Sequence, residues 1–374
     1  MVLTSTMNIV KATRAYETWL AKHITLLPAD LQKKHQAMAQ DVFPFFRATF
    51  YRWMQLWPTV CADAARAPHV LAVGDLHVEN FGTWRDVEGR LVWGINDFDE
   101  AYHLPYTIDL VRLAASAHVA IREARLEIAA KDACDAILIG YKKSLEIGGV
   151  PYVLAEDHDW LRGMVTGILR DPRQFWRKFD SLPTLKGRVP KSARRAIERL
   201  LPERGLDYRI VHRIAGLGSL GRERYVAISV CRGAHVAREA KALAPSACVF
   251  ASEGKVSERI RYQEALDKSV RDADPFVHLR GSWIVRRLAP DCSRVELASM
   301  PKERDESRLL RAMGFETANV HLGTPRAAQT ILRDLGKRSG EWLHEAATAM
   351  VKATTADFRE WRTTARRKPV KIVR

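Results

Sequence analysis

The chain has 374 residues, of which 47% are hydrophobic and 28% charged, a composition that argues against wholesale disorder and suffices for two lobes. It contains no apolar run near the roughly 18 residues that span a bilayer, and its first 25 residues mix charges into the apolar pattern, unlike a secretory signal. The net charge of +16 favours anionic partners such as nucleotides, nucleic acid or an acidic substrate.

The cysteines predict a reducing, cytoplasmic setting. All five are scattered along the chain and none forms a CxxC pair, so neither a zinc site nor a disulfide framework is expected. No membrane partner is expected. The dense basic run at the C-terminal end is either a solvated, frayed terminus or an arm that binds nucleic acid, and the sequence leaves its role open. It consists of Arg362, Arg366, Arg367, Lys368, Lys371 and Arg374.

The first half of the chain predicts helices, then a small group of strands, then helices again. Residues 8–66 have apolar positions at helical spacing. The short apolar runs at 69–73 and 91–95 predict strands, and turn residues at 86–89 place a hairpin between them. Helices are expected over 107–123 and 127–146.

The second half changes character near residue 206. Residues 147–205 are punctuated by prolines and end in a basic helix over 191–201. Residues 208–230 alternate as strands about a glycine cluster. The remaining pattern predicts a strand at 235–241, a helix at 256–271, a strand at 282–288 and mostly helix from 303.

Two short motifs in the first half carry the chemistry. Asp75 and Asn80 lie in Gly-Asp-Leu-His-Val-Glu-Asn, and Asp97 and Asp99 lie in the Asn-Asp-Phe-Asp turn at 96–99. An Asp followed five residues later by an Asn, and then by an Asp-Phe turn, is typical of kinase-like phosphotransferases. Asp75 would orient and deprotonate an acceptor hydroxyl. Asn80 and Asp97 would give oxygen ligands to magnesium, with Asp99 as a second carboxylate.

Two neighbouring residues have alternative interpretations. His77 lies inside the first motif, where a hydrogen-bonding brace is favoured over a metal ligand. Asp109 would either cap the following helix or have a structural role at its start.

The glycine cluster predicts a phosphate-binding turn. Gly216, Gly218 and Gly221 form Gly-x-Gly-x-x-Gly between two predicted strands, where backbone amides can approach phosphates closely. Ser219 would add a hydroxyl. A plain glycine hairpin is the alternative. Lys241 on the third strand would pair with the phosphates, with Arg238 as the fallback. Either Glu258 or Glu264 would pair with Lys241.

The longer pattern resembles a known family. Gly-Asp-x-His-x-x-Asn-Phe-Gly, Asp-Phe-Asp-Glu-Ala and Asp-Leu-x-Arg-Leu-Ala are similar to DUF2252, a bacterial family grouped with the protein-kinase-like fold. The catalytic segment also resembles aminoglycoside and choline phosphotransferases. Those enzymes usually have a histidine before Gly-Asp, where this chain has Val73, so support for the loop must come from elsewhere.

The resemblance implies an α+β, protein-kinase-like fold of two lobes. The glycine turn follows Asp75 by about 140 residues, so if both halves build one site the order is circularly permuted relative to common kinases, with extra helices at both ends. The alternative is that the Asp75 motif works with a different nucleotide-binding half. We expect an N-terminal helical segment (1–66), a helical catalytic lobe (67–205), a small β-rich nucleotide-binding lobe (206–300) and C-terminal helices packed on the catalytic lobe (301–374).

The expected activity is transfer of phosphate from ATP, with Mg²⁺, to a hydroxyl of a small molecule or a protein. Transfer of AMP, and a pseudokinase-like module that binds nucleotide without transferring anything, are the alternatives. Nucleic acid is not expected as a partner. Binding that rests on net charge would weaken steeply with salt and would survive Asp75→Ala.

Overall fold

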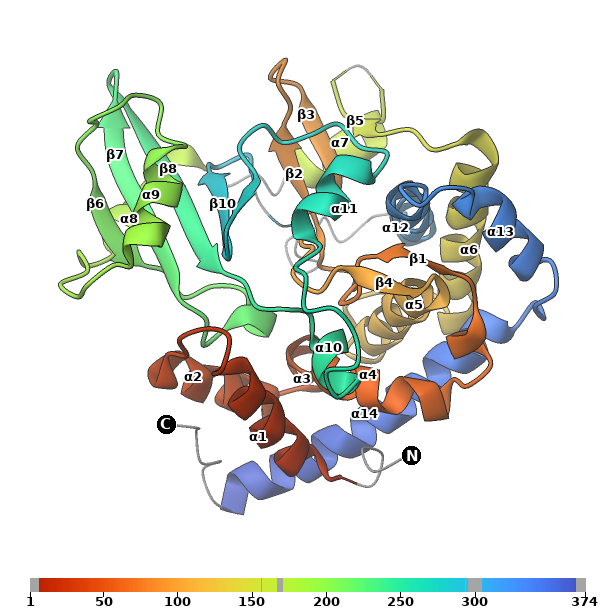
Figure 1. The fold of residues 1–374 in the computed structure, drawn as a ribbon. Coiled ribbons are helices and arrows are strands. Elements are labelled where there is room, and N and C mark those ends of the chain that lie inside the picture. Colours follow the sequence, from red (N-terminus) through yellow and green to blue (C-terminus); the bar gives the residue numbers. More distant parts are fainter. Residues whose placement is uncertain (1–6, 156, 167–170, 293, 295–304, 368–374) are drawn as a thin grey trace.

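The computed structural model describes residues 7–155, 157–166, 171–292, 294 and 305–367 (Figure 1). The predicted α+β class is confirmed, because helices surround several small antiparallel sheets. The kinase-like arrangement and the permuted order remain predictions. Within the described residues, no helix combines the length and the apolar character that crossing a bilayer requires. The end of the basic run, 368–374, lies outside the described residues.

The N-terminal segment is helical, as predicted. Each helix turns an apolar face inward, and aromatic side chains such as Tyr16, Phe46 and Trp53 join the largest core. The elements are α1 (Ile9–Leu20), α2 (Pro28–Met38), α3 (Val42–Ala48), α4 (Phe50–Val60) and the 3₁₀ turn η1 (Ala64–Arg66).

Short strands follow and carry the first motifs. β1 (His69–Ala72) pairs with β4 (Tyr102–Pro105), and β3 (Leu91–Ile95) pairs with β2 (Phe81–Arg85) and β5 (Tyr152–Val153). The β2–β3 hairpin lies between the two motifs, as the turn residues predicted. Both motifs therefore leave strand ends, which fix their backbones.

The helices that share the largest core, together with β1–β5, are called the large lobe. They pack around α5 (Thr107–Arg122), which is buried along almost its whole length. α6 (Ala130–Ile147) packs on α12 (Glu306–His321), and α14 (Trp342–Arg367) packs on α5 and α4. The C-terminal helices thus pack on α4, α5 and α6, and Figure 1 shows α14 running beneath the N-terminal helices. The other helices of the region are α7 (Asp159–Thr166) and α13 (Ala327–Leu335).

The second-half strands form one antiparallel sheet in the order β6-β7-β8-β10-β9. The strands are β6 (Arg209–His212), β7 (Arg224–Cys231), β8 (Ala234–Ala242), β9 (His278–Arg280) and β10 (Trp283–Leu288). Between β6 and β7 lies the 3₁₀ turn η2 (Leu217–Ser219). The strands predicted from the sequence in this half all belong to the sheet, whereas β9 was not predicted.

The domain boundaries differ from the prediction at two places. α8 (Pro172–Asp180) and α9 (Lys191–Glu198), expected in the catalytic lobe, cover opposite faces of the five-stranded sheet. Phe175 and Phe179 pack on one face, and Ala193 and Ile197 pack on the other. Conversely, α10 (Ala247–Ala251) and α11 (Tyr262–Lys268) join the core of the large lobe. Burial of apolar faces, which sequence order does not fix, decides both placements.

The helix predicted over 256–271 is shorter than expected. Only Tyr262–Lys268 is helical, because the chain before it makes tertiary hydrogen bonds instead. Tyr102 donates its hydroxyl to the carbonyl of Ser257 at 2.6 Å, which takes an acceptor that an internal helix bond would use.

Candidate active site

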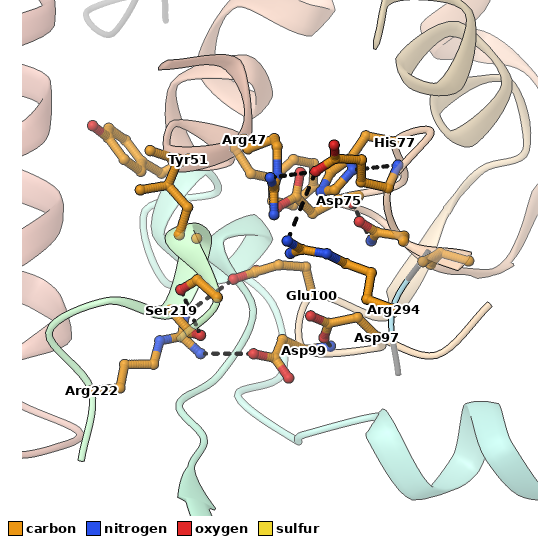
Figure 2. Close-up of a pocket in the computed structure, with 18 of the residues that line it drawn as sticks. Arg47, Tyr51, Asp75, His77, Asp97, Asp99, Glu100, Ser219, Arg222 and Arg294 are labelled. Atoms are coloured by element: carbon orange, nitrogen blue, oxygen red, sulfur yellow. Dashed lines mark hydrogen bonds and ion pairs between the residues drawn. The ribbon is translucent and has the colours of Figure 1, made fainter. Parts of the chain in front are cut away.

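One pocket lies where the large lobe meets the glycine turn (Figure 2). The first motif contributes Asp75, His77 and Asn80, the Asp-Phe turn contributes Asp97 and Asp99, and the glycine turn contributes Gly216, Gly218 and Ser219. The remaining lining residues include Tyr16, Lys34, Arg47, Glu79, Glu100, Arg222 and Arg294. Segments about 140 residues apart in sequence therefore face one cavity.

The loop that carries Asp75 is held by a buried chain of hydrogen bonds. Asp109 on α5 accepts from the backbone nitrogens of Val73 (2.6 Å) and Gly74 (2.8 Å). His321 on α12 lies 3.0 Å from Asp109 and 2.7 Å from the hydroxyl of Tyr141. Asp109 thus braces the loop instead of capping its helix. This series of hydrogen bonds supports the Asp75 loop, which Val73, in place of a histidine, cannot do.

Asp75 is held by Arg112, a buried residue of α5. Arg112 Nε donates to Asp75 Oδ1 at 2.7 Å, and its Nη2 contacts the same oxygen. The guanidinium lies over the rings of Phe46 (4.2 Å) and Trp53 (4.8 Å), which fix its position. Burial raises the pKa of Asp75 to about 7, although the Arg112 charge opposes the rise. Asp75 can therefore exchange a proton near neutral pH.

Asn80 is oriented by its own loop. Its Nδ2 donates to the carbonyl of Asp75 at 2.8 Å, and its backbone accepts from the nitrogen of Asn96 at 3.0 Å. Because the amide nitrogen is engaged, Oδ1 is the side-chain atom suited to a cation. The same bonds tie the first motif to the Asp-Phe turn.

Asp97 and Asp99 meet Lys241 on β8. Lys241 Nζ lies 2.5 Å and 2.7 Å from the two carboxylate oxygens of Asp99 and 3.8 Å from Asp97. Asp97 is 48% exposed, so its carboxylate faces the pocket. Burial would raise the pKa of Asp97, but the Lys241 ammonium and hydrogen bonds from Asp99 hold it at about 2. Asp97 is therefore ionised and available to a cation at neutral pH.

The residues predicted to partner Lys241 do not do so. Glu264 pairs with Arg261 and Lys268, and Glu258 lies 3.7 Å from His23. Arg238 does not line the pocket: it stands three positions before Lys241 on β8 and so points to the opposite face of the sheet, where it bonds the Leu200 carbonyl. Asp99 and Asp97 pair with Lys241 in place of the helix glutamate that was predicted.

The glycine turn is anchored by the N-terminal helical segment. Lys34 on α2 donates to the Gly218 carbonyl at 3.1 Å, and the Gly221 carbonyl accepts from Leu27 at 2.8 Å. Gly221 has φ +96, and an added Cβ would lie 2.4 Å from Leu31. A Cβ on Gly218 would be 3.7 Å from Asp75 Oδ2, so the turn lies directly beside that carboxylate.

A cationic cluster stands behind the turn. Arg224 bonds Ser219 Oγ at 2.8 Å and Glu239 at 2.9 Å. Arg213 and Arg286 also contact Glu239, which is fully buried. Three guanidinium groups against one carboxylate leave a net charge of two positive units beside the turn. Such a field favours anionic groups in the adjoining space.

His77 behaves as the brace that the sequence favoured. Its Nδ1 accepts from the backbone nitrogen of Glu79 at 3.2 Å. Burial, together with nearby arginines, lowers the pKa of His77 well below its usual range, so the ring is neutral. Glu79 in turn accepts from Arg47 at 2.6 Å, and Arg294 lies 3.9 Å away.

Several pocket residues escaped the sequence reasoning. Glu100, next to Asp99, accepts from the backbone of Ala247 (2.6 Å) and pairs with Arg222 at 3.3 Å. Its position directly after the Asp-Phe-Asp run was a usable signal, as was that of Arg222 directly after the last glycine. Lys34 gave no such signal, because it belongs to an ordinary amphipathic helix. Arg112 belongs to the Asp-Leu-x-Arg-Leu-Ala motif, but the sequence predicted no role for it.

The pocket suits a divalent cation. It gathers five carboxylate side chains: Asp75, Glu79, Asp97, Asp99 and Glu100. Burial raises the pKa of Asp75, Asp99 and Glu100, which means that their ionised forms are destabilised. Additional positive charge in the pocket would stabilise these carboxylates. The ionised, half-exposed Asp97 and the oxygen of Asn80 are hard ligands of the kind that Mg²⁺ prefers.

Comparison with known proteins gives one family match. Residues 26–150 match DUF2252, described as an uncharacterized protein conserved in bacteria. This confirms the family resemblance over the segment that holds Asp75, Asn80 and Asp97, whereas the glycine turn and Lys241 lie outside it. Neither the curated proteins nor the solved structures include a significant match.

Proposed function

We propose that the protein is a Mg²⁺- and ATP-dependent phosphotransferase that acts on a hydroxyl group of a small molecule or a protein. The observation that carries the proposal is that Asp75, Asn80, Asp97 and the glycine turn line one pocket. In kinase-like enzymes these parts must converge on the transferred phosphate, because catalysis there consists mainly of positioning and electrostatic stabilisation.

Asp75 is the proposed base. The acceptor hydroxyl would give its proton to the Asp75 carboxylate as its oxygen attacks the γ-phosphorus. The bond from that phosphorus to the bridging oxygen breaks, and ADP leaves. A pKa of about 7 is well matched to this task, because the group is substantially ionised at neutral pH yet basic enough to accept a proton.

The glycine turn and Lys241 would receive the phosphates. β6, the turn, β7 and β8 follow in that order, so Lys241 stands on the third strand of the sheet. A glycine loop followed by a lysine on the third strand is the kinase arrangement. The net positive cluster around Glu239 supports an anionic ligand at this place. Bound phosphates would compete with Asp99 for Lys241.

Magnesium would bind beside Lys241, at the Asp-Phe turn. Asp97 and Asn80 would hold it, and Asp99 would join them when Lys241 turns to the phosphates. The ion would offset charge on the phosphate oxygens. Since β6–β10 come after the Asp75 motif, this proposal includes the permuted order of the kinase-like lobes.

The test is incubation with ATP labelled at either the γ- or the α-phosphate, together with a lysate as a source of acceptors. Label transferred from the γ-position supports the proposal. Label from the α-position indicates AMP transfer, and nucleotide binding without transfer indicates a binding module. Either of these results would overturn the phosphotransferase assignment.

Variants connect the activity to the site. Asp75→Ala and Asp97→Ala should each lower transfer by roughly 10³-fold or more while leaving the fold intact, since a positioned base alone contributes 10²–10⁴-fold. Asp63→Ala is the matched control, because its side chain is 82% exposed and remote from the pocket. Unchanged transfer in either pocket variant would contradict the assigned role.

A further inference from the structure

Two imidazoles and a thiol meet outside the pocket, where three helices come together. His118 belongs to α5, Cys134 to α6 and His344 to the first turn of α14. One nitrogen or sulfur atom from each lies within 4.8 Å of the other two. His118 Nε2 is 3.3 Å from Cys134 Sγ, and the two imidazole centroids are 5.2 Å apart.

We propose that His118, Cys134 and His344 bind a zinc ion. Imidazole nitrogen and thiolate sulfur are the ligands that Zn²⁺ selects over harder ions such as Mg²⁺. Tetrahedral coordination with ordinary bond lengths places a nitrogen and a sulfur ligand roughly 3.6 Å apart. The His118–Cys134 pair, at 3.3 Å, is already near that separation, and a ligand atom of His344 lies within 4.8 Å of both.

One unsatisfied atom at the cluster is consistent with metal coordination. His344 Nδ1 is buried and finds no hydrogen-bond partner among the described residues. A buried polar atom left in this way is costly, and coordination would remove that cost. His118 Nε2 lies 3.1 Å from the Ala130 carbonyl, which accepts its proton in this structure, so zinc binding would break that hydrogen bond and move the proton to Nδ1.

Zinc binding would be coupled to proton release. A cysteine coordinates zinc as the thiolate, so Cys134 would lose its proton on coordination and that proton would pass to solvent.

The ion would fasten the C-terminal helix. α14 packs on α5 and α6 at this cluster and also contacts α1, α3 and α4, whose residues line part of the pocket. Three protein ligands leave one coordination position for water, and the partial exposure of His344 provides access. None of the three ligands lines the pocket that holds Asp75, so the site stands independently of the proposed phosphotransferase activity.

The experiment uses the full chain without a polyhistidine tag, stripped with a chelator and titrated calorimetrically with Zn²⁺. One ion should bind per chain, Mg²⁺ should not compete, and Co²⁺ should give a thiolate-to-metal charge-transfer band. A hundredfold excess of zinc over its Kd should raise the unfolding midpoint by roughly 3 °C.

Variants separate the site from adventitious binding. Cys134→Ser and His344→Asn should weaken zinc binding by more than about 100-fold, because even outer-shell partners contribute 10–100-fold. Cys61→Ser is the matched control: its buried thiol also reaches α14, at the Ala346 carbonyl, but has no histidine beside it. His344→Asn also guards against misfolding, since its ring is only partly buried. Absence of binding by the wild type, or equal binding by His344→Asn, would overturn the proposal.

Discussion

Replacing Asp75 with asparagine should change how stability depends on pH, in addition to removing the proposed base. Asparagine keeps the shape of the side chain and an oxygen that accepts from Arg112, but it carries no charge. In the wild type that charge is only 19% exposed and stands near Glu100 and Asp97. The ionised carboxylate therefore opposes folding at any pH where it forms.

The sign follows from the displaced pKa. In the unfolded chain the carboxyl titrates near its ordinary value of 3.8, whereas in the folded protein burial raises the pKa to about 7. Between these values the folded protein holds a proton that the unfolded chain releases. The contribution of Asp75 to stability is thus present in full below pH 4 and is lost as the pH rises through 7.

The magnitude comes from the same displacement. A pKa moved from 3.8 to about 7 corresponds to at most about 4 kcal/mol. The free energy of unfolding of the wild type should therefore fall relative to that of Asp75→Asn by about 2–4 kcal/mol between pH 4 and pH 8. The attraction between Arg112 and the ionised carboxylate is already contained in this pKa, so its loss in the variant adds no separate pH-dependent effect.

Urea unfolding followed by tryptophan fluorescence, at several pH values between 4 and 8.5, measures the difference directly. Other buried carboxyls with a raised pKa, such as Glu316, are common to both proteins and cancel. Asp63→Asn, on an exposed side chain, should run parallel to the wild type. Parallel curves for Asp75→Asn and the wild type would show that burial does not dominate at Asp75, and the argument for its role as a base near neutral pH would lose its support.

Three further predictions concern the same site. The rate of transfer should rise with pH through about 7. Arg112→Gln should move that rise to higher pH, because it removes the charge that lowers the pKa of Asp75, whereas Arg112→Lys should not. A pH–rate profile that is the same in both variants contradicts this. His321→Ala should lower kcat by about 10–100-fold through loss of its contact to Asp109, with little change in KM for ATP, whereas a purely structural role would leave kcat per folded molecule unchanged. Gly218→Ala should lower kcat/KM by about 10-fold, since the methyl group would stand 3.7 Å from the Asp75 carboxylate, and full activity would place the reacting phosphate elsewhere.

Local signals in the sequence determined much of the site and its framework. The strand at 91–95, the helix beginning at Thr107 and the third strand of the sheet follow from periodicity and turn residues, and the structure has them at nearly the predicted bounds. The Asp75 and Asp97 motifs and the glycine turn were likewise recognisable, because each is a short run whose backbone conformation its own residues dictate. Their convergence was an expectation that rested on resemblance.

Only the tertiary structure decided which charges meet. Arg112 holds Asp75 across 37 residues, Lys34 holds Gly218 across 184, and Lys241 takes Asp99 as its partner instead of a helix glutamate. These pairs depend on how α2, α5 and β8 pack, and packing is governed by buried apolar area that many sequences satisfy equally well. Hydrogen bonds within a turn are fixed by neighbouring residues, whereas contacts between distant charges exist only once the whole chain has folded.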